Sequence, residues 1–441
     1  MNLLKSIYHF CLAHIAAIFY DFPSRKILVF GVTGTKGKSS TTEMLNAIFE
    51  EAGYKTALVN SIRVKVGDSS MPNKMRMSMP GRFFLQKFFA RALEENCKLA
   101  IVEMTSEGAR QHRHRGIELD ALLFTNLAPE HIESHGSFEA YRNAKFSIGR
   151  QLARSRKRFR VMVANADDVE SLRYLQLPVE KTLGYSLRGD KSHAADQNGG
   201  HFMFNFTNIA LKLPGNFSLE NALAAATLAD AFGIGTPTIA RALGKISRIP
   251  GRAEKIEAGQ DFSVVVDYAH TPESLQALYS AYSTARKICV LGATGGGRDT
   301  WKRPVLGKVA SENCDYVILT NEDPYDEDPK TIINQISSGM RNKSEVILDR
   351  REAISRGIEI ALSMSNGQKD TQLLDSAPIR GPEQGPSGPI ERRGDQNSVA
   401  VLITGKGTDP TIQGPGGSSI PWSDAQIARE ALETKLRTKT V

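Results

Sequence analysis

Short apolar runs alternate with longer amphipathic segments along the first half of the chain. The apolar runs have the length of strands and cover residues 26–30, 55–60, 98–104, 121–126 and 160–165. The helix-like segments cover residues 39–52, 83–96 and 219–232. Apolar strands that alternate with helices are typical of a mostly parallel sheet covered on both faces. The pattern therefore predicts an α/β domain over residues 26–249.

The same pattern restarts after the Ile-Pro-Gly-Arg segment at residues 249–252. Strand-like runs cover residues 262–266, 287–291, 316–320 and 399–404, with helices between them. This predicts a second, Rossmann-like α/β domain over residues 250–441, and a chain of 441 residues is long enough for two or three domains. Residues 366–398 are rich in Gly, Pro, Gln and charge, so we expect a disordered surface insertion there.

The N-terminal residues 7–20 form an apolar stretch that His9 and His14 interrupt. The stretch is shorter than the roughly 20 residues that a spanning helix needs. Residues 1–25 are therefore interpreted first as an amphipathic helix packed on the first domain. A helix lying on a membrane surface, in weak contact through residues 1–20, is the second interpretation, and a signal peptide is the third.

Charge and cysteine content narrow the choice of partners. The net charge is +8, but the basic residues are scattered, and the densest run, residues 154–160, is typical of a solvated helix end. No nucleic-acid partner is expected, whereas small anionic substrates suit this balance. The four cysteines show no metal-binding spacing. Cys97, Cys289 and Cys314 lie in or beside strand-like runs and are expected to be buried thiols in a reducing, cytoplasmic compartment.

A glycine-rich segment between the first strand and the first helix carries the most informative chemistry. Its backbone N–H groups can surround phosphate oxygens, and the helix N-terminus adds a favourable dipole. Lys38 can bridge the β- and γ-phosphates, and Ser39 can offer a hydroxyl to Mg²⁺. The spacing is unusual because Val32 stands where the common motif has glycine. The alternative is a glycine-rich turn that binds nothing. The predicted ATP-binding residues of this loop are Gly34, Thr35, Lys36, Gly37, Lys38, Ser39 and Ser40.

Several motifs, taken in order, resemble those of the Mur ligases, the ATP-dependent amide-forming enzymes of peptidoglycan synthesis. The motifs are GVTGTKGKSST at residues 31–41, EMTSEG at 103–108, QHR at 111–113, FTNLAPEHIESHG at 124–136, YRNAK at 141–145, DRREAI at 349–354 and GKG at 405–407. The resemblance covers nearly the whole chain from residue 26 and is greatest to the branch that adds the third peptide residue. It implies a central P-loop-type parallel-sheet ATPase domain followed by the Rossmann-like domain.

The chemistry of amide synthesis agrees with these residues. ATP must activate a carboxylate as an acyl phosphate, so the site needs cations near two anions, and ATP with Mg²⁺ are the expected cofactors. The resemblance implies that Glu103 and His131 hold a second Mg²⁺, in addition to the ion to which Ser39 can offer its hydroxyl. It also implies that Lys145 is carbamylated, which requires an amine with a lowered pKa. Taken alone, Glu103 would be a salt-bridge partner at a strand end, His131 a satisfied polar residue, and Lys145 a surface lysine.

The resemblance also assigns residues to the nucleotide and to the two other substrates. Asn221, Arg252 and Asp267 match positions near ATP, although Arg252 and Asp267 could equally be interdomain hinge residues. A muramoyl-peptide precursor and an amino acid are the expected substrates. The residues predicted to bind them are Thr105, Gln111, Arg113, Arg298, Glu322, Asp323, Pro324, Tyr325, Gly405 and Asp409.

The chain departs from the family pattern at two places. Only about 25 residues precede the first strand, too few for the usual uridine-binding domain. The acceptor is then held without a uridine site, as in a branch that acts on lipid-linked precursors, or a partner subunit supplies one. The second departure is Tyr325, which stands where diaminopimelate-adding members carry arginine. Because tyrosine cannot pair with a second carboxylate in two-pronged fashion, we expect lysine or another mono-carboxylate amino acid to be preferred.

Two rival functions remain open from the sequence. A folylpolyglutamate-synthetase-like ligase has a similar loop but fits Gln111–Arg113 and the Glu322 region less well. A nucleotide-binding subunit without ligase activity, in a complex acting on lipid-linked cell-wall precursor, is the other. The joint presence of Lys38, Glu103, His131 and Lys145 disfavours a degenerate site of this second kind.

Overall fold

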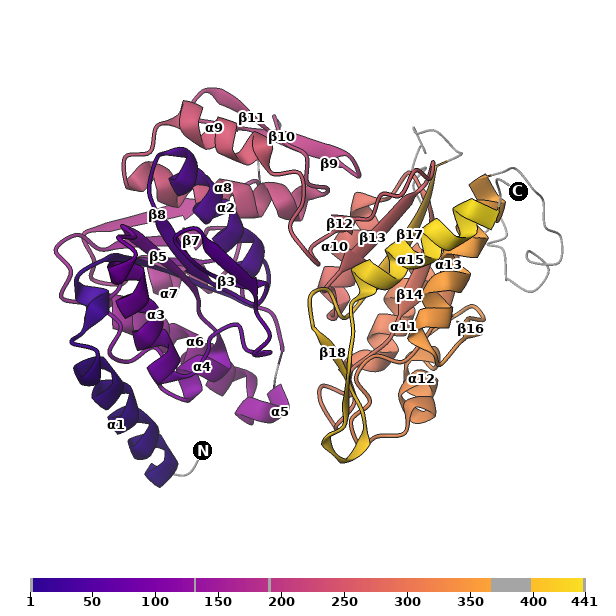
Figure 1. Ribbon diagram of the computed structural model, residues 1–441, viewed down its shortest axis with the longest axis horizontal. Helices are drawn as coiled ribbons and strands as arrows, with labels where there is room; N and C mark the ends of the chain where they lie inside the picture. The colour runs from indigo at the N-terminus through magenta and orange to yellow at the C-terminus, as the bar shows by residue number, and fades with distance from the viewer. Residues whose placement is uncertain (1–2, 131, 189–191, 366–397, 439–441) are drawn as a thin grey trace. The chain divides into compact units, whose positions relative to one another are not determined.

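The computed structural model describes residues 3–130, 132–188, 192–365 and 398–438. The chain divides into two compact units, Met1–Ser247 and Arg248–Val441, close to the boundary expected near residue 250. The insertion expected at residues 366–398 lies, apart from Ser398, outside the described residues. The two units are drawn in Figure 1 and are described separately below.

The first unit is built on an eight-stranded sheet. Its strands are β1 (Leu28–Thr33), β2 (Thr56–Val59), β3 (Arg63–Val66), β4 (Ser69–Pro72), β5 (Leu99–Glu103), β6 (Ala121–Phe124), β7 (Val161–Asn165) and β8 (Lys181–Tyr185). They lie in the order β4-β3-β2-β5-β1-β6-β7-β8. The six strands from β2 to β8 in this order pair in parallel, whereas β3 and β4 extend the edge as an antiparallel hairpin. The carboxyl ends of β5, β1 and β6 therefore lie side by side, which positions the site.

Helices cover both faces of this sheet (Figure 1). The helices are α1 (Leu3–Phe19), η1 (Pro23–Arg25), α2 (Lys38–Glu51), α3 (Arg82–Glu94), α4 (Ser106–Arg110), α5 (Ile132–His135), α6 (Phe138–Ala153), α7 (Ser171–Leu175), α8 (Asn216–Ala231) and α9 (Thr236–Lys245). Successive side chains of β1 point to opposite faces. Val29 belongs to the core formed with α3, α6 and α7, while the ring of Phe30 contacts Phe49 of α2, which packs against α8. A small antiparallel sheet, β9 (Ala194–Asp196), β10 (Gly199–Phe204) and β11 (Thr207–Leu211), completes the unit.

The second unit has a six-stranded sheet of its own. Its strands are β12 (Glu254–Lys255), β13 (Ser263–Asp267), β14 (Arg286–Leu291), β15 (Tyr316–Leu319), β16 (Glu345–Val346) and β17 (Val399–Thr404), in the order β12-β13-β17-β14-β15-β16. All pairs are parallel except β12 with β13. The other elements are α10 (Pro272–Ala281), α11 (Lys302–Asn313), α12 (Pro329–Ser337), α13 (Arg350–Ser365), β18 (Thr411–Gln413), η2 (Pro415–Gly417), β19 (Ser419–Pro421) and α15 (Asp424–Thr438). The predicted fold class, a central parallel-sheet domain followed by a C-terminal α/β domain, is confirmed.

The N-terminal helix α1 packs against α3 at the outside of the first unit (Figure 1). Ala13, Ala16 and Ala17 of α1 are fully buried, so the helix is packed on the domain as the first interpretation expected. Among the described residues, none of the helices combines the length and the apolar character needed to cross a bilayer.

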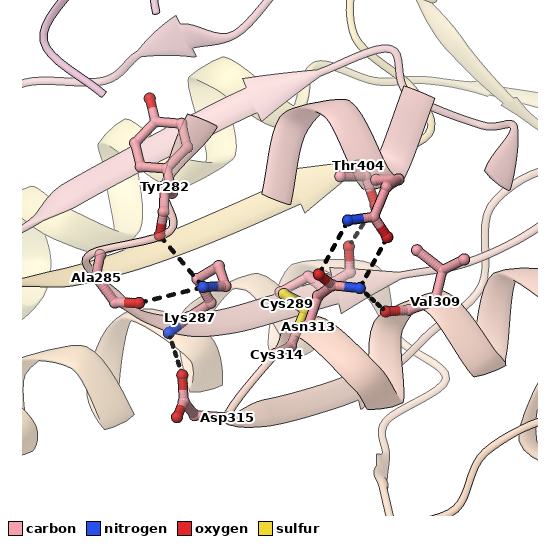
Figure 2. The surroundings of a disulfide bond; sticks show 11 residues. Tyr282, Ala285, Lys287, Cys289, Val309, Asn313, Cys314, Asp315 and Thr404 are labelled. Carbon is pink, nitrogen blue, oxygen red and sulfur yellow. Dashed lines mark hydrogen bonds between the residues drawn. A yellow bond between two sulfur atoms is a disulfide. The ribbon is translucent and has the colours of Figure 1, made fainter. Parts of the chain in front are cut away.

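The expectation of three buried thiols is wrong for two of them. Figure 2 shows Cys289 of β14 joined to Cys314, which follows α11, by a disulfide bond. The two residues are 25 positions apart in sequence, but α11 returns the chain to β15, the parallel neighbour of β14, and the Cα atoms lie 6.2 Å apart. That distance is within the usual range for a disulfide. Cys97 is buried as expected, with a free thiol, and Cys11 is free and exposed. The cysteines therefore no longer support a reducing compartment.

The disulfide should contribute measurably to the stability of the second unit. Closing a loop of this length lowers the entropy of the unfolded chain, so the Cys289→Ala/Cys314→Ala variant should lose about 3 kcal/mol of unfolding free energy. Urea unfolding with and without a reductant measures this, and only the parent should respond to the reductant. Thiol labelling of the unfolded, unreduced protein should modify only Cys11 and Cys97. Four labelled thiols before reduction would contradict the bond.

Candidate active site

The glycine-rich loop joins β1 to α2 at the carboxyl end of a central strand. Gly34 has a φ of 144° and Gly37, which precedes α2, has a φ of 80°. A Cβ atom on Gly34 would lie 1.9 Å from Thr125 Oγ1, and one on Gly37 would lie 2.2 Å from Asn221 Oδ1. Both the backbone conformation and the close approach therefore require glycine. Ser40 lies in the first turn of α2 and is largely buried.

Three consecutive carbonyl groups of the loop accept hydrogen bonds from protein side chains. Lys145 Nζ donates to the oxygen of Gly34 over 2.5 Å, and Lys38 Nζ donates to that of Thr35 over 2.7 Å. Thr125 Oγ1 donates to the oxygen of Lys36 over 2.6 Å. The first N–H groups of an α-helix have no carbonyl partner within the helix. The loop thus directs its carbonyls into the protein at the point where the N-terminus of α2 favours an anion.

The segment after β6 holds the loop from the side. Thr35 N donates to the oxygen of Asn126 over 2.8 Å, and Lys36 N donates to Asn126 Oδ1 over 2.9 Å. Thr125 and Asn126 belong to the motif at residues 124–136, but neither was predicted as a site residue. The available signal was their position directly after an apolar strand, because neighbouring parallel strands end at the same edge of the sheet.

Ser39 and Glu103 meet at this edge. Ser39 Oγ donates to Glu103 Oε2 over 2.8 Å, and Ser61 N donates to the same oxygen over 3.1 Å. Glu103 is the last residue of β5 and is almost completely buried. A hydroxyl and a carboxylate are hard oxygen donors of the kind that Mg²⁺ prefers. The described residues contain no cluster of three or more His, Cys, Asp or Glu able to hold a metal ion. This donor set fits an ion that keeps water and phosphate ligands, as Mg²⁺ usually does.

Lys145 of α6 is buried behind the loop. Its Nζ lies 4.8 Å from the ring centre of Tyr141, whose hydroxyl is 2.9 Å from Thr35 Oγ1. Burial, followed by repulsion from Lys38, lowers the pKa of Lys145 well below its ordinary value, against the opposing effect of Glu130 and Glu103. The neutral amine that carbamylation requires is therefore favoured at this position.

Two further residues of the first unit were predicted at this site: Asn221 near ATP and His131 as a metal ligand. Asn221 of α8 accepts a hydrogen bond from Thr41 Oγ1 over 3.3 Å, so α8 places its side chain against the loop. His131 lies outside the described residues, and its predicted role as a metal ligand stays a prediction.

The predicted acceptor residues of the first unit follow β5. Thr105 caps α4 by accepting a hydrogen bond from Gly108 N over 3.1 Å. Arg113 donates to Gln111 Oε1 over 2.8 Å and to the oxygen of Met79 over 2.5 Å. Gln111 Nε2 donates to Glu107 Oε1 over 2.8 Å. Burial lowers the pKa of Arg113, and the charge of Glu107 opposes this shift.

In the second unit, Asp267 and Arg252 lie close together. Asp267 accepts hydrogen bonds of 2.6 Å from the backbone N–H groups of Ala253 and Ala269. Burial raises the pKa of Asp267, while the charge of Arg252 opposes this. The Arg252 guanidinium lies 4.6 Å from the ring centre of Tyr268. These contacts order the turn after β13, and they leave both roles, nucleotide binding or hinge, as predictions.

Glu322 and Gly405 follow β15 and β17 and approach each other closely. A Cβ atom on Gly405, whose φ is 108°, would lie 2.2 Å from Glu322 Oε2. Glu322 Oε1 accepts a hydrogen bond from Thr294 Oγ1 over 2.8 Å. Its Oε2 is buried and accepts no hydrogen bond from the residues that the structure describes. A buried carboxylate oxygen in this state is suited to a cationic ligand group.

Asp323 and Asp409 are both paired with Lys406, which is almost completely buried. Lys406 Nζ lies 2.7 Å from Asp323 Oδ2 and 3.2 Å from Asp409 Oδ2. Asp323 Oδ1 also accepts a hydrogen bond of 2.7 Å from Gln413 N. Asp323 therefore contributes to the order of the strand ends, and Glu322 is the better oriented of the two acids for a ligand.

Arg298 and Tyr325 form a pair beside this group. The guanidinium carbon of Arg298 lies 4.9 Å from the ring centre of Tyr325, which has a φ of 53°. Pro324 and Tyr325, together with β18 and the segment before β19, line a pocket of about 560 Å³. The structure thus gathers the predicted amino-acid residues of the second unit around the ends of β15 and β17.

Sequence reasoning missed the buried ion pair under these strand ends. Arg350 Nε and Nη2 donate to the two carboxylate oxygens of Asp424 over 2.8 and 2.7 Å, and both side chains are fully buried. Arg350 Nη2 also donates to the oxygen of Thr404 over 2.7 Å. Arg350 belonged to a quoted motif, but nothing in the sequence signalled Asp424 as its partner, 74 positions away.

Comparison with known proteins defines the class of protein. Residues 32–229 match the family described as the Mur ligase middle domain, and residues 251–372 match the Mur ligase glutamate ligase domain. The chain is 34% identical over 436 residues to a protein of Caldanaerobacter subterraneus named UDP-N-acetylmuramoyl-L-alanyl-D-glutamate–2,6-diaminopimelate ligase, covering 96% of this chain and 81% of that protein. It is 33% identical over 443 residues to a UDP-N-acetylmuramyl-tripeptide synthetase of Roseiflexus, with the same coverage. The chain therefore belongs to the Mur ligase family of ATP-dependent ligases.

Solved structures agree with this fold. A structure named as a UDP-N-acetylmuramoyl-L-alanyl-D-glutamate–2,6-diaminopimelate ligase matches with a TM-score of 0.57 at 24% identity, covering 93% of this chain and 79% of that one. A folylpolyglutamate synthase of Mycobacterium tuberculosis matches with a TM-score of 0.66 at 15% identity, covering 96% and 94%. At these identities the likeness concerns the fold alone.

Lys145 provides a direct chemical test of the site. Because burial and the charge of Lys38 lower the pKa of its amine, Lys145 should react with dissolved carbon dioxide to form a carbamate. Peptide mapping with isotope-labelled bicarbonate, trapped by alkylation, should label Lys145 and leave Lys65, another buried lysine, unlabelled. Lys145→Ala should lose turnover that short-chain carboxylates partly restore. An unlabelled Lys145 whose removal has no effect would exclude it from the site.

Proposed function

We propose that the protein forms an acyl phosphate from ATP and the carboxylate of a muramoyl-peptide precursor and joins an amino acid to it. The observation that supports this most is the convergence of Lys38, Ser39, Glu103 and Lys145 on one loop in a chain of this family. The proposal places the enzyme in peptidoglycan precursor synthesis. It also places it in the cytoplasm, because ATP is one of its substrates.

The proposed reaction has two balanced steps. A carboxylate oxygen of the acceptor attacks the γ-phosphorus of ATP, and ADP leaves. The amine of the amino acid then attacks the acyl carbon, loses a proton, and inorganic phosphate leaves. Each step moves negative charge between oxygens, so positioned cations are the main catalytic contribution that the protein can make.

The residues divide this work by their chemistry. The N-terminus of α2 and Lys38 bind the phosphates and stabilise the transferring group. Ser39 and Glu103 would hold Mg²⁺, which supplies charge neutralisation between the phosphates. Gln111 and Arg113 bind the anionic acceptor, with Thr105 ordering α4 beside them. In the second unit, Glu322 binds the cationic end of the incoming amino acid, and Arg298 its carboxylate.

Folylpolyglutamate synthesis is the second candidate. The M. tuberculosis folylpolyglutamate synthase is covered almost completely by this chain, whereas the diaminopimelate ligase structure is covered over 79% of its length. The same chemistry serves both reactions, and only the acceptor differs. Turnover of ATP with UDP-linked muramoyl dipeptide, lipid-linked muramoyl dipeptide or a folate as acceptor, with the products identified by mass spectrometry, separates the candidates. A nucleotide-binding subunit would turn over none of them alone, and only a partner subunit would restore activity.

Lys38 should be essential for turnover. Lys38→Ala removes the loop ammonium, and loss of one such transition-state contact costs about 3 kcal/mol or more, which is on the order of a hundredfold in rate. Phosphate release that depends on both acceptor and amino acid is the measurement. Lys98→Ala, which removes an exposed lysine outside the predicted site, serves as the control and should keep most of the activity. Turnover of Lys38→Ala within about threefold of the parent would refute the assignment of the loop.

Tyr325 should disfavour an amino acid with two carboxylates. Without a guanidinium at this position, the second carboxylate of diaminopimelate has no two-pronged partner there, so lysine should have the higher kcat/KM. Tyr325→Arg should shift the ratio toward diaminopimelate by about tenfold, or 1.4 kcal/mol. Tyr325→Phe is the control and should leave the ratio unchanged. Several relatives are named as diaminopimelate ligases, so the parent could also prefer diaminopimelate. That result would contradict the prediction and would assign the second carboxylate to Arg298.

A further inference from the structure

The solvent-facing side of α1 is apolar along its whole length. Most of its exposed apolar residues occur every three or four positions and form one band on the helix, while exposed Lys5 and Phe10 lie outside this band. We call this band the apolar stripe, and it consists of Leu4, Ile7, Tyr8, Cys11, Ile15, Ile18 and Phe19. Leu4 and Phe19, near its two ends, are each 73% exposed. Continuous apolar surface of this kind on a folded domain marks an interaction site.

The stripe continues onto α3, where basic residues join it. The rings of Phe19 and Phe83 lie 6.3 Å apart. Phe83, Lys87 and Arg91 are all exposed and four residues apart, so they share one face of α3. This face carries two cations directly after the apolar residue that extends the stripe.

The charges along the stripe are of one sign. Lys5 is exposed on α1, and Arg82 lies near Tyr8. Residues 3–19 contain no Asp or Glu. Asp21, the first acid of the chain, is 2.5 Å from Lys26, and Glu94 lies at the end of α3. An apolar band bordered by Lys and Arg is the pattern of a helix that lies in the surface of a membrane.

We propose that the apolar stripe docks the protein on the surface of an anionic lipid bilayer, with α1 parallel to that surface. Lys5, Lys87 and Arg91 would face lipid phosphates, which attract basic groups near the surface. A second copy of this chain is a poorer occupant, because pairing two stripes would bring these cations against those of the other copy. The length of α1, 17 residues, is consistent with a helix that lies on the bilayer and does not cross it.

Docking would bring the proposed acceptor residues near the membrane. Ser6 Oγ lies 2.8 Å from His112 Nε2, and the ring of Phe10 contacts that of His112. His112 lies between Gln111 and Arg113, so α1 is attached to the segment that binds the acceptor under the proposed function. This consequence rests on the proposed function, whereas lipid binding itself does not.

Sedimentation with vesicles tests the docking. The full chain should bind vesicles of phosphatidylcholine and phosphatidylglycerol and should bind pure phosphatidylcholine at least about tenfold less. Ile7→Gln/Ile18→Gln should lose about tenfold or more of the partition into the mixed vesicles. Val169→Gln/Leu172→Gln is the matched control, since both residues are exposed apolar groups outside α1, at 83% and 64%, and it should bind like the parent. Unchanged thermal unfolding of each variant shows that it is folded.

Three results would overturn the proposal. Equal binding of the parent and Ile7→Gln/Ile18→Gln to mixed vesicles would remove the stripe from any lipid contact. Equal binding to both vesicle types would remove the role of the cations. A parent that is dimeric by sedimentation equilibrium, becomes monomeric in the stripe variant and ignores vesicles would assign the stripe to a second copy. Turnover with soluble acceptor, measured in parallel, should be unchanged in the stripe variant, so failure of the ligase assignment and failure of lipid docking are distinguishable.

Discussion

The hydrogen bond from the buried Lys145 amine to the carbonyl of Gly34 is the contact on which the first unit's site depends. Together with Lys38 and Thr125, it binds three consecutive carbonyl oxygens of the loop. With these carbonyls turned toward the protein, and the N–H groups of Thr35 and Lys36 bonded to Asn126, the start of α2 can face an anion. Gly34 and Gly37 are required because these contacts leave no space for a side chain. The conformation of the predicted phosphate loop therefore depends on contacts with α6, with the segment after β6 and with α8, as well as on the sequence of the loop.

The second unit orders its strand ends by buried ion pairs in place of a glycine loop. The Arg350–Asp424 pair joins the start of α13 to the start of α15 and reaches the last carbonyl of β17. Lys406 pairs with both Asp323 and Asp409 and so joins the two segments that carry these acids. Removing one partner of such a pair costs about 3–5 kcal/mol, because a buried charge is left without compensation. Glu322 Oε2 has no such partner among the described residues, so Glu322 differs from these structural acids and is the group best placed for a ligand.

The parts of the fold that were predictable are those in which local pattern and tertiary environment agree. The buried parallel strands β5, β6, β7, β13, β14, β15 and β17 are mostly apolar and could be predicted within one or two residues, and β1 within three. The β3–β4 hairpin could not be predicted, because residues 69–72 are exposed at the sheet edge and form no apolar run. The Cys289–Cys314 bond and the Arg350–Asp424 pair also escaped prediction, because only the return of a crossover helix brings their members together. Lys145 and Glu103 could be named only through the family resemblance, since a lysine in a helix and a glutamate at a strand end are common.

The basic residues, scattered in the sequence, are partly gathered by the fold at the place where an anionic acceptor is proposed to bind. Arg82 of α3 and Arg113 after α4 are 31 positions apart in the printed sequence, yet burial and the charge of Arg113 lower the pKa of Arg82. The same two cations, after burial, lower the pKa of His9 of α1. Cations that repel one another in this way destabilise the folded unit, and Glu107 opposes the effect only at Arg113 among these groups. The positive charge at the junction of α1, α3 and the Gln111–Arg113 segment is thus suited to a bound anion, and α1 forms one side of that junction.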